Sequence, residues 1–446
     1  MRKTSFALAL LTAGILSACG GSSPRGGDQT PAIQFSAQVS FGDSLSDVGS
    51  YAVGGVKALG GGKFTINGDN TAISPDLTGK NWTEFVAAQL KLPAPCPAQT
   101  GLEGDATKGF AVPVTFNTGC LGYAQGGARV TNPIGSGNKA VDPTLGATTV
   151  PVVTQVANHL AKNGGKFNGT ELVTVTAGGG EILFLLEQLS KNATAAGMQA
   201  FAVSLATQLA AGATNPATAA QSIGLAIQTE AARPGHTDTT VVQAAVAAAF
   251  AAGNTAAAQP SVYLPMVDKA KAAGDQAGAA YLAANGPGVV TAMATAGAEL
   301  AALVKTQIIA KGANYVLVNN LPDVASTPSA KAQSATVQAL IQTAVDAFNA
   351  QLKASVASEP KVLYVDLWGI SHDEVINPGP YGLSNTSTPA CGPNALGTTS
   401  LVCNATNVVA GDVSHYMFAD DVHPTPYEGW LIARYILEQM ATKGWL

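Results

Sequence analysis

The sequence predicts an α/β fold built on a parallel β-sheet. Short, continuous apolar runs have the composition of buried strands, at residues 38–41, 172–176, 315–318 and 362–365. Longer stretches between and around them have helical patterns, at residues 83–90, 150–161, about 290–310 and 332–357. Continuous apolar runs are typical of strands that are covered on both faces, and the alternation of strand and helix favours parallel pairing.

Residues from about 192 to 286 differ in composition from the rest of the chain. Alanine dominates, strand-like runs are absent, and breakers such as Asn215-Pro216 and Arg233-Pro234-Gly235 divide several helical pieces. We interpret this segment as an all-helical insertion within one α/β domain that spans residues 37–446. Two roles for it stay open: a lid over an apolar substrate, or a structural addition that serves as an interaction surface.

The N-terminus has the pattern of a bacterial export signal. A short positive segment, Met1-Arg2-Lys3, precedes an uncharged apolar stretch over residues 6–16. The following Leu16-Ser17-Ala18-Cys19 resembles a lipobox, in which Cys19 would be lipidated and become the mature N-terminus. We therefore expect a lipoprotein signal peptide over residues 1–18 and a flexible Gly/Ser-rich tether over residues 19–36. The alternative is an ordinary signal peptide that happens to contain a cysteine.

This signal predicts an exported protein of the bacterial cell envelope that is held on a membrane by a lipid on Cys19. The residue after Cys19 is not Asp, which by resemblance to bacterial sorting signals favours the outer membrane. After the signal, no run of about 18 strongly apolar, uncharged residues predicts a transmembrane helix. The formal net charge is −5 and Lys/Arg clusters are absent, so we expect no nucleic-acid partner.

Beyond Cys19, the chain contains Cys96, Cys120, Cys391 and Cys403. An even number of cysteines in an exported chain predicts two disulfides, for which three pairings are possible. We favour Cys96–Cys120 and Cys391–Cys403 because each pair closes a local, turn-rich loop. Zinc binding is the alternative, but the spacings are unlike those of zinc sites and no histidine lies nearby in the sequence.

The first candidate for chemistry is the segment from Phe41 to Asp47, which reads Phe-Gly-Asp-Ser-Leu-Ser-Asp. It follows a predicted strand, so Ser44 would lie at the carboxyl edge of the sheet, where α/β active sites form. Gly42 permits a sharp turn, after which Ser44 can offer both its hydroxyl and its own N–H to a reacting carbonyl. The tetrapeptide Gly-Asp-Ser-Leu alone is a weak signal.

The second candidate is the segment Asp420-Asp421-Val422-His423-Pro424 near the C-terminus. A carboxylate three residues before a histidine can bind Nδ1 of the ring and leave Nε2 free to take a proton from a serine. We expect Asp420 to be this carboxylate and keep Asp421 as the alternative. The two motifs at opposite ends of the chain together predict a Ser–His–Asp site.

These two motifs resemble those of the GDSL/SGNH hydrolase family, and further blocks extend the resemblance. They are Gly122 to Ala128 (Gly-Tyr-Ala-Gln-Gly-Gly-Ala), Asn319 to Val324 with Thr327-Pro328, and Asn377-Pro378 through Tyr381-Gly382 to Cys391. The resemblance covers about residues 37–190 and 287–446, in the correct order.

The resemblance implies a flavodoxin-like, three-layer α/β/α fold and the hydrolysis of carboxylic esters of small molecules, lipids or polymers, without metal or cofactor. By resemblance, Ser44 is the nucleophile, His423 the base and then the acid, and Asp420 the orienting carboxylate. The N–H groups of Ser44 and Gly127 would stabilise the oxyanion. An acyltransferase that uses the same acyl-enzyme, and a degenerate member that only binds, remain alternative functions.

The chain departs from the family pattern in the block Gly-x-Asn-Asp, whose Asn supplies a third oxyanion donor. Here Gly180 stands in place of that Asn and Glu181 in place of the Asp, and Gly122 replaces the leading Asn of another block. We expect a substitute donor: the backbone N–H of Gly180 or Glu181, or a side chain from another loop. A Gly180→Asn change is then expected to alter turnover little.

Overall fold

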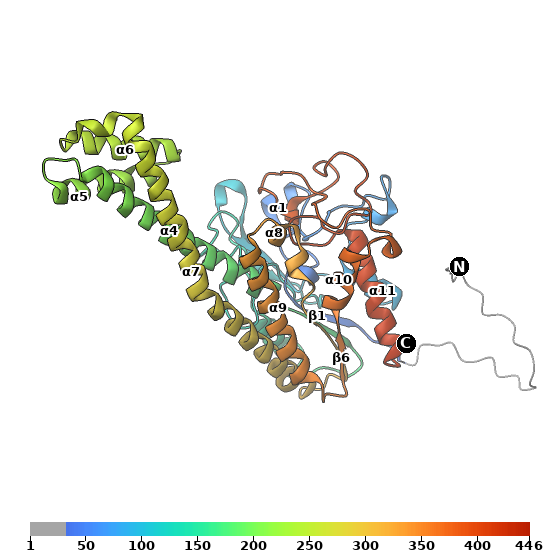
Figure 1. The fold of residues 1–446 in the computed structure, drawn as a ribbon. Coiled ribbons are helices and arrows are strands. Elements are labelled where there is room, and N and C mark those ends of the chain that lie inside the picture. Colours follow the sequence, from blue (N-terminus) through green and yellow to red (C-terminus); the bar gives the residue numbers. More distant parts are fainter. Residues whose placement is uncertain (1–32) are drawn as a thin grey trace, which may run out of the picture.

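The computed structural model describes residues 33–446 (Figure 1). The predicted signal peptide, Cys19 and most of the predicted tether lie outside the described residues. A four-stranded parallel sheet is formed by β1 (Gln38–Gly42), β4 (Leu172–Thr176), β5 (Tyr315–Asn319) and β6 (Val362–Val365), in the order β1-β4-β5-β6. These are the four strands predicted from the apolar runs.

A short segment extends the sheet beyond β1. Ser40 donates its N–H to the carbonyl of Leu121 (3.0 Å), and Tyr123 donates to the carbonyl of Ser40 (2.7 Å), so this segment runs parallel to β1. With this segment counted second along the chain, the spatial order becomes 2-1-3-4-5, which is the flavodoxin-like order. The carboxyl end of β1 therefore lies at the topological switch point, where ligands bind in such sheets.

Helices cover both faces of the sheet. Successive side chains of a strand point to opposite faces, so each strand contributes apolar side chains to both helical layers. One core cluster joins Val316 and Val318 to α3 (Val152–Lys162), the first turns of α4 (Gly179–Ala210), α7 (Pro260–Leu303) and α9 (Ala335–Val356). A second joins Leu317 to α2 (Trp82–Gln89), α10 (Leu367–Ile376) and α11 (Pro426–Thr442). The fold is thus a three-layer α/β/α sandwich, as predicted.

A helical arm projects from this sandwich (Figure 1). It consists of the outer parts of α4 and α7 together with α5 (Pro216–Ala231), α6 (Asp238–Ala251) and a 3-10 turn at Thr255–Ala258. A separate core of mostly Ala, Leu and Ile side chains, including Leu205, Leu209 and Ile223, holds the tip together. The arm is not a detached module, because α4 and α7 run without interruption from the sandwich into it.

The sequence predicts no transmembrane helix after the signal, but helix α7 is long and apolar enough to need examination. Residues Pro260–Ile309 include an 18-residue window with a mean hydropathy of 1.4, so by length and composition alone this stretch could cross a membrane. The helix instead packs on α4 and α9, and its side chains Met293 and Leu300 are fully buried in the core of the sandwich. We therefore assign α7 to the fold.

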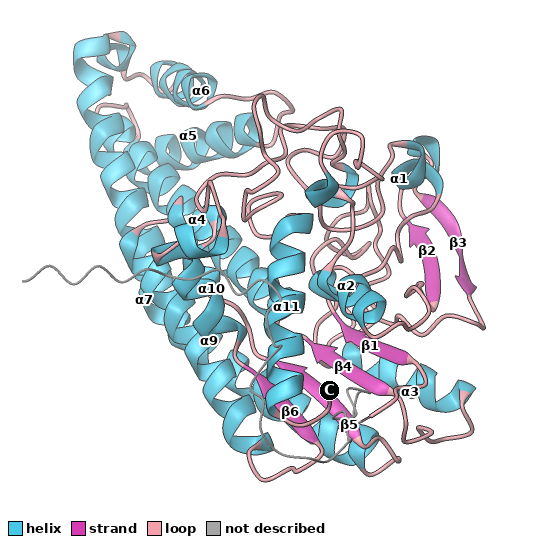
Figure 2. Cartoon of the chain, turned by 90° about the vertical axis from the view of Figure 1, so that its right-hand side faces the viewer, coloured by secondary structure: helices cyan, strands magenta, loops and turns pink. Residues whose placement is uncertain are grey.

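Away from the main sheet, β2 (Gln99–Glu103) and β3 (Ala111–Phe116) form a separate antiparallel pair (Figure 2). The remaining helices are short: α1 (Gly54–Ala58), α8 (Pro328–Lys331), single 3-10 turns and a π-helical segment, Val304–Ile309, that continues α7. The structure contains the disulfides Cys96–Cys120 and Cys391–Cys403, which is the pairing favoured from the sequence. The second disulfide lies in the long loop region that leads to His423.

Candidate active site

Ser44 follows directly on β1 at the carboxyl edge of the sheet. Gly42 has φ +150°, and a Cβ at this position would lie 2.0 Å from the carbonyl oxygen of Thr176. Only glycine permits this close approach of β1 to β4. Asp43 then caps a short 3-10 turn, Ser44–Ser46, by accepting the N–H of Leu45 (3.2 Å). This turn raises Ser44 from the sheet and leaves its side chain partly exposed.

His423 lies just before α11, in a loop whose conformation is restrained on both sides. Thr425 caps α11 by accepting the N–H of Glu428, and Pro426 occupies the first helical position. The hydroxyl of Thr65 donates to the carbonyl of Pro424 (2.9 Å). The ring of Phe64 packs against that of His423 with centroids 4.9 Å apart. The imidazole is therefore held by covalent, polar and apolar restraints together.

The structure brings Ser44, His423 and Asp420 into one hydrogen-bonded series. Nδ1 of His423 lies 2.8 and 2.9 Å from the two carboxylate oxygens of Asp420, and Nε2 lies 2.8 Å from Oγ of Ser44. An ionised carboxylate can only accept a hydrogen bond, so Nδ1 carries the ring proton. Nε2 is then unprotonated and accepts a hydrogen bond from the hydroxyl of Ser44. This is the arrangement in which an imidazole can remove a proton from an attacking serine.

Asp420 is held as an anion by several donors. It is 4% exposed and also accepts the backbone N–H groups of His423 (2.7 Å), Val422 (3.0 Å) and Ser400 (2.7 Å). Burial acts to raise the pKa of Asp420, but the charge of His423 and these hydrogen bonds outweigh it and hold the pKa well below its usual range. Asp421, the alternative, is exposed and has no hydrogen bond to His423 among the described residues.

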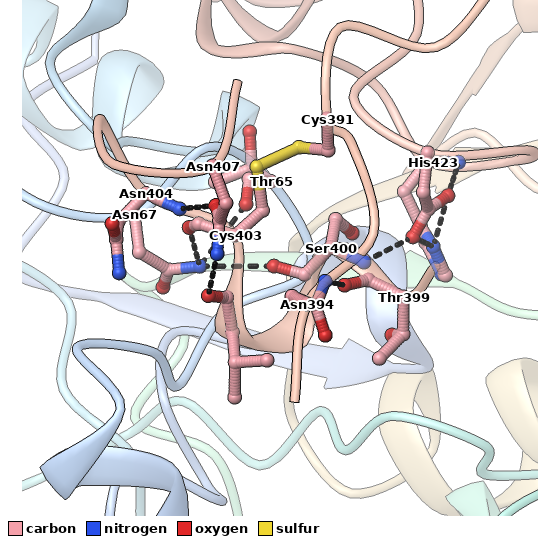
Figure 3. Close-up of a disulfide and its surroundings, with 12 residues drawn as sticks. Thr65, Asn67, Cys391, Asn394, Thr399, Ser400, Cys403, Asn404, Asn407 and His423 are labelled. Atoms are coloured by element: carbon pink, nitrogen blue, oxygen red, sulfur yellow. Dashed lines mark hydrogen bonds and ion pairs between the residues drawn. A yellow bond between two sulfur atoms is a disulfide. The ribbon is translucent and has the colours of Figure 1, made fainter. Parts of the chain in front are cut away.

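The loop that supplies Ser400 is closed by the Cys391–Cys403 disulfide (Figure 3). On its other side, the amide group of Asn67 donates to the carbonyls of Ser400 (3.1 Å) and Cys403 (3.0 Å). Ser400 is fully buried between these restraints and directs its N–H at the Asp420 carboxylate. The disulfide therefore stabilises the loop that orients the acid of the series.

Two further buried carboxylates connect the Ser44 turn to neighbouring loops. Asp47 accepts the N–H of Gly126 (2.9 Å), and Asp43 accepts the N–H groups of Gly179 (2.9 Å) and Gly180 (3.3 Å) with one oxygen. Burial raises the pKa of Asp43 to about 6 and that of Asp47 above its ordinary value, while hydrogen bonds from N–H groups oppose the rise. Each carboxylate fixes one segment of the site relative to Ser44.

Ser44 and Gly127 supply two backbone donors to the same cavity. Within residues 33–446, the N–H of Ser44 and that of Gly127 have no hydrogen-bond acceptor, and both residues line a cavity of about 450 Å³ beside His423. Gly127 has φ +74°, and a Cβ there would lie 2.1 Å from the carbonyl oxygen of Ser136. Glycine is therefore required where this loop turns toward the cavity. Two unpaired N–H groups beside a serine hydroxyl can stabilise an oxyanion.

The expectation for Gly180 needs correction. It lines the cavity, but its N–H is engaged by Asp43 rather than free. A Cβ at this position would lie 2.1 Å from the carbonyl oxygen of Ala128, so the site has no room for an asparagine side chain. Gly180→Asn would therefore displace the loop around Gly127, and from this packing we expect it to lower turnover rather than to alter it little. Glycine here allows α4 to approach that loop closely.

Glu181, which replaces the family's Asp, has a structural partner that the sequence did not indicate. Its carboxylate accepts Nε of Arg129 (2.8 Å) and the N–H of Val130 (3.2 Å), and a second guanidinium nitrogen also contacts it. Both charged side chains are buried. The pair therefore anchors the segment after Gly127 to the first turn of α4. An Asp side chain is one methylene group shorter and would not reach Arg129 in the same geometry.

The walls of the 450 Å³ cavity are mostly apolar or made of glycine. Apart from Ser44 and His423, its lining includes Phe64, Leu145, Leu183 and Leu401. Such walls exclude water and strengthen the electrostatic interactions inside. Across residues 33–446, no group of three or more His, Cys, Asp or Glu side chains is placed to hold a metal ion.

Comparison with known proteins adds partial sequence matches to this geometry. No family model matches the chain. GDSL esterase/lipase APG of Arabidopsis thaliana is 28% identical over 145 residues, which cover 30% of this chain and 41% of the relative. Another GDSL esterase/lipase of the same plant is 35% identical over 80 residues, 18% of this chain and 22% of the relative. The matched segment thus spans less than half the length of each of these curated relatives.

The fold and the site define an α/β/α protein with a Ser–His–Asp series at the carboxyl edge of a flavodoxin-like sheet. Several of the relatives that match part of the chain are GDSL esterases or lipases, the family that the motifs resemble. Over part of its length, the chain is therefore similar to GDSL esterases and lipases.

Replacing Asp420 and Asp421 by Asn, one at a time, distinguishes their roles. Asp420→Asn should lower kcat by about 10⁴, because an amide cannot hold the Nδ1–H tautomer of His423 in place. Asp421→Asn is the matched control and should leave kcat near the wild-type value, since this side chain is exposed. Steady-state hydrolysis of p-nitrophenyl butyrate measures both, and a larger loss in Asp421→Asn would contradict the assignment.

The two disulfides should differ in their effect on activity. Replacing either pair by serine should cost about 3 kcal/mol of stability in the chain-entropy model. Cys391→Ser/Cys403→Ser should also lower kcat by about tenfold or more, because Ser400 then orients Asp420 less well. Cys96→Ser/Cys120→Ser should leave kcat unchanged at a temperature where both proteins are folded. Equal kcat in the two double variants would show that the loop does not position Asp420.

Proposed function

We propose that this protein is a serine hydrolase of carboxylic esters, with Ser44 as nucleophile, His423 as general base and Asp420 as orienting acid. The observation that carries the proposal is the 2.8 Å contact between Nε2 of His423 and Oγ of Ser44, with Nδ1 bound by a buried carboxylate. Nucleophile, base and orienting group within hydrogen-bond reach of one another are the pattern of an activated serine.

The proposed reaction has two halves. Oγ of Ser44 attacks the ester carbonyl carbon while Nε2 of His423 takes the hydroxyl proton, and the resulting oxyanion lies against the N–H groups of Ser44 and Gly127. The bond from carbon to the alcohol oxygen then breaks, and His423 returns its proton to the departing alcohol. Water attacks the acyl-enzyme with His423 again as base, which releases the carboxylic acid and restores Ser44.

The site supports an active enzyme better than a degenerate binding member. Removal of one oxyanion donor typically lowers kcat by about 10²–10³, so two backbone donors without the family's Asn would give a slower enzyme that still turns over. The complete hydrogen-bonded series from Asp420 through His423 to Ser44 would have no evident use in a protein that only binds. An ester is the substrate class that uses all of these groups.

Ser44→Ala should abolish ester hydrolysis without loss of the fold. The hydroxyl is partly exposed and bonds only His423 among the described residues, so its removal should change the melting temperature little. Hydrolysis of p-nitrophenyl acetate and butyrate, together with a thermal melt, measures both effects. Undiminished turnover in a folded Ser44→Ala variant would refute the proposed nucleophile.

We also propose that the protein is attached to a membrane of the bacterial envelope through a lipid on Cys19. The lipobox-like sequence and the Gly/Ser-rich segment after it support this proposal. Cys19→Ser should move the protein from the membrane to the soluble fraction on cell fractionation, while Ser17→Thr serves as a nearby control. Export of Cys19→Ser with unchanged membrane association would contradict lipidation.

A further inference from the structure

A second, larger cavity of about 1210 Å³ lies along the helical arm. Its walls come from α4, α6, α7 and the segment that includes α8 and the start of α9, and we call it the arm groove. Most of its surface is apolar, and its lining includes Leu186, Met198, Phe201, Leu264 and Val337. Five charged residues also line it: Glu187 and Lys191, which form an i,i+4 ion pair, and Asp238, Lys271 and Asp275.

The arm groove and the catalytic cavity share a wall residue. Leu183 lines both cavities, and Gly180, one helical turn before it, lines the catalytic cavity. From Leu183, one row of α4 residues that line the arm groove recurs every three or four positions, through Leu186, Ser190, Ala193, Gly197 and Phe201, and Glu187, Leu189, Lys191, Thr194 and Met198 line it beside this row. This spacing places the row in one stripe along a single face of α4. The helix therefore carries a continuous surface from the site of Ser44 outward along the arm.

The groove is long and open. From Leu183 to Phe201 the axis of α4 rises by about 27 Å, at about 1.5 Å per residue. Met198 is 53% exposed and Leu264, on the facing helix α7, is 51% exposed. At the arm, Gly197 and Gly274 bring α4 and α7 close, since a Cβ on Gly274 would lie 2.9 Å from the carbonyl oxygen of Gly197. Exposed apolar side chains that face one hollow mark a binding surface rather than scattered surface residues.

We infer that the arm groove binds the acyl chain of a long-chain ester whose carbonyl is held at Ser44. This inference rests on the proposed function. The ester carbonyl would be held beside Ser44, and an acyl chain too long for the 450 Å³ cavity would reach the arm groove past Leu183, which lines both cavities. The largely apolar stripe of α4 runs outward from Leu183, and burial of each methylene group on it favours binding. An acyl chain attached to the reacting carbonyl is the occupant that could follow this stripe from Ser44 into the arm groove.

The test compares p-nitrophenyl esters with acyl chains of two, four, eight, twelve and sixteen carbons, each below its critical micelle concentration. Wild-type kcat/KM should rise with chain length beyond four carbons. Met198→Asp should lower the ratio of kcat/KM for the twelve-carbon ester to that for the four-carbon ester by about tenfold or more, because a charge then faces the chain. Leu264→Asp, on the opposite wall, should lower the same ratio.

Val203→Asp is the matched control. Val203 lies on the same helix and is 61% exposed, but it does not line the arm groove. This variant should keep the wild-type ratio, and circular dichroism should show that all three variants are folded. A ratio that Met198→Asp and Leu264→Asp leave unchanged would overturn the inference while short-ester hydrolysis still upholds the proposed function. Wild-type protein that hydrolyses no ester of any length would overturn both.

Discussion

Asp43 and Asp47, the two carboxylates that flank the Ser44 turn, each accept backbone N–H groups from a different part of the chain. Asp47 binds the loop of Gly126 and Gly127, and Asp43 binds the first turn of α4. Both are fully buried, where an unpaired charge would be strongly unfavourable. The N–H groups offset this cost only in one arrangement of the loops, so the Ser44 turn, the Gly127 donor and the start of α4 are held in fixed relation.

The same constraint accounts for the packing around Gly180 and Glu181, the two residues that depart from the motif that the chain resembles. With Asp43 bound to the start of α4, this helix lies so close to the Gly127 loop that a side chain at residue 180 would overlap the carbonyl of Ala128. Glu181 then reaches across to Arg129 and Val130 and holds the segment that follows. The residues that depart from the motif are therefore those that join the start of α4 to the Gly127 loop, a contact that a motif comparison alone cannot reveal.

Much of the fold could be predicted from the pattern of apolar residues in the sequence. All four strands of the main sheet are continuous apolar runs, and helices such as α2 and α9 have clear periodicity. The β2–β3 pair was not predicted, because β3 is largely exposed and lacks the buried pattern of a strand. Ser44, Asp420 and His423 were found from spacing and resemblance, since each lies in a short local motif. Ser400 was missed, because it acts through its backbone N–H, which no side-chain pattern marks.

The central claim is that Ser44 is an activated nucleophile, and covalent labelling tests it without any assumption about the substrate. A fluorophosphonate probe reacts with a serine only when a neighbouring base removes the hydroxyl proton. After treatment of the folded protein, peptide mass spectrometry should find one adduct, on Ser44, and prior denaturation should prevent it. Labelling at another serine, or no labelling of folded protein, would contradict the account.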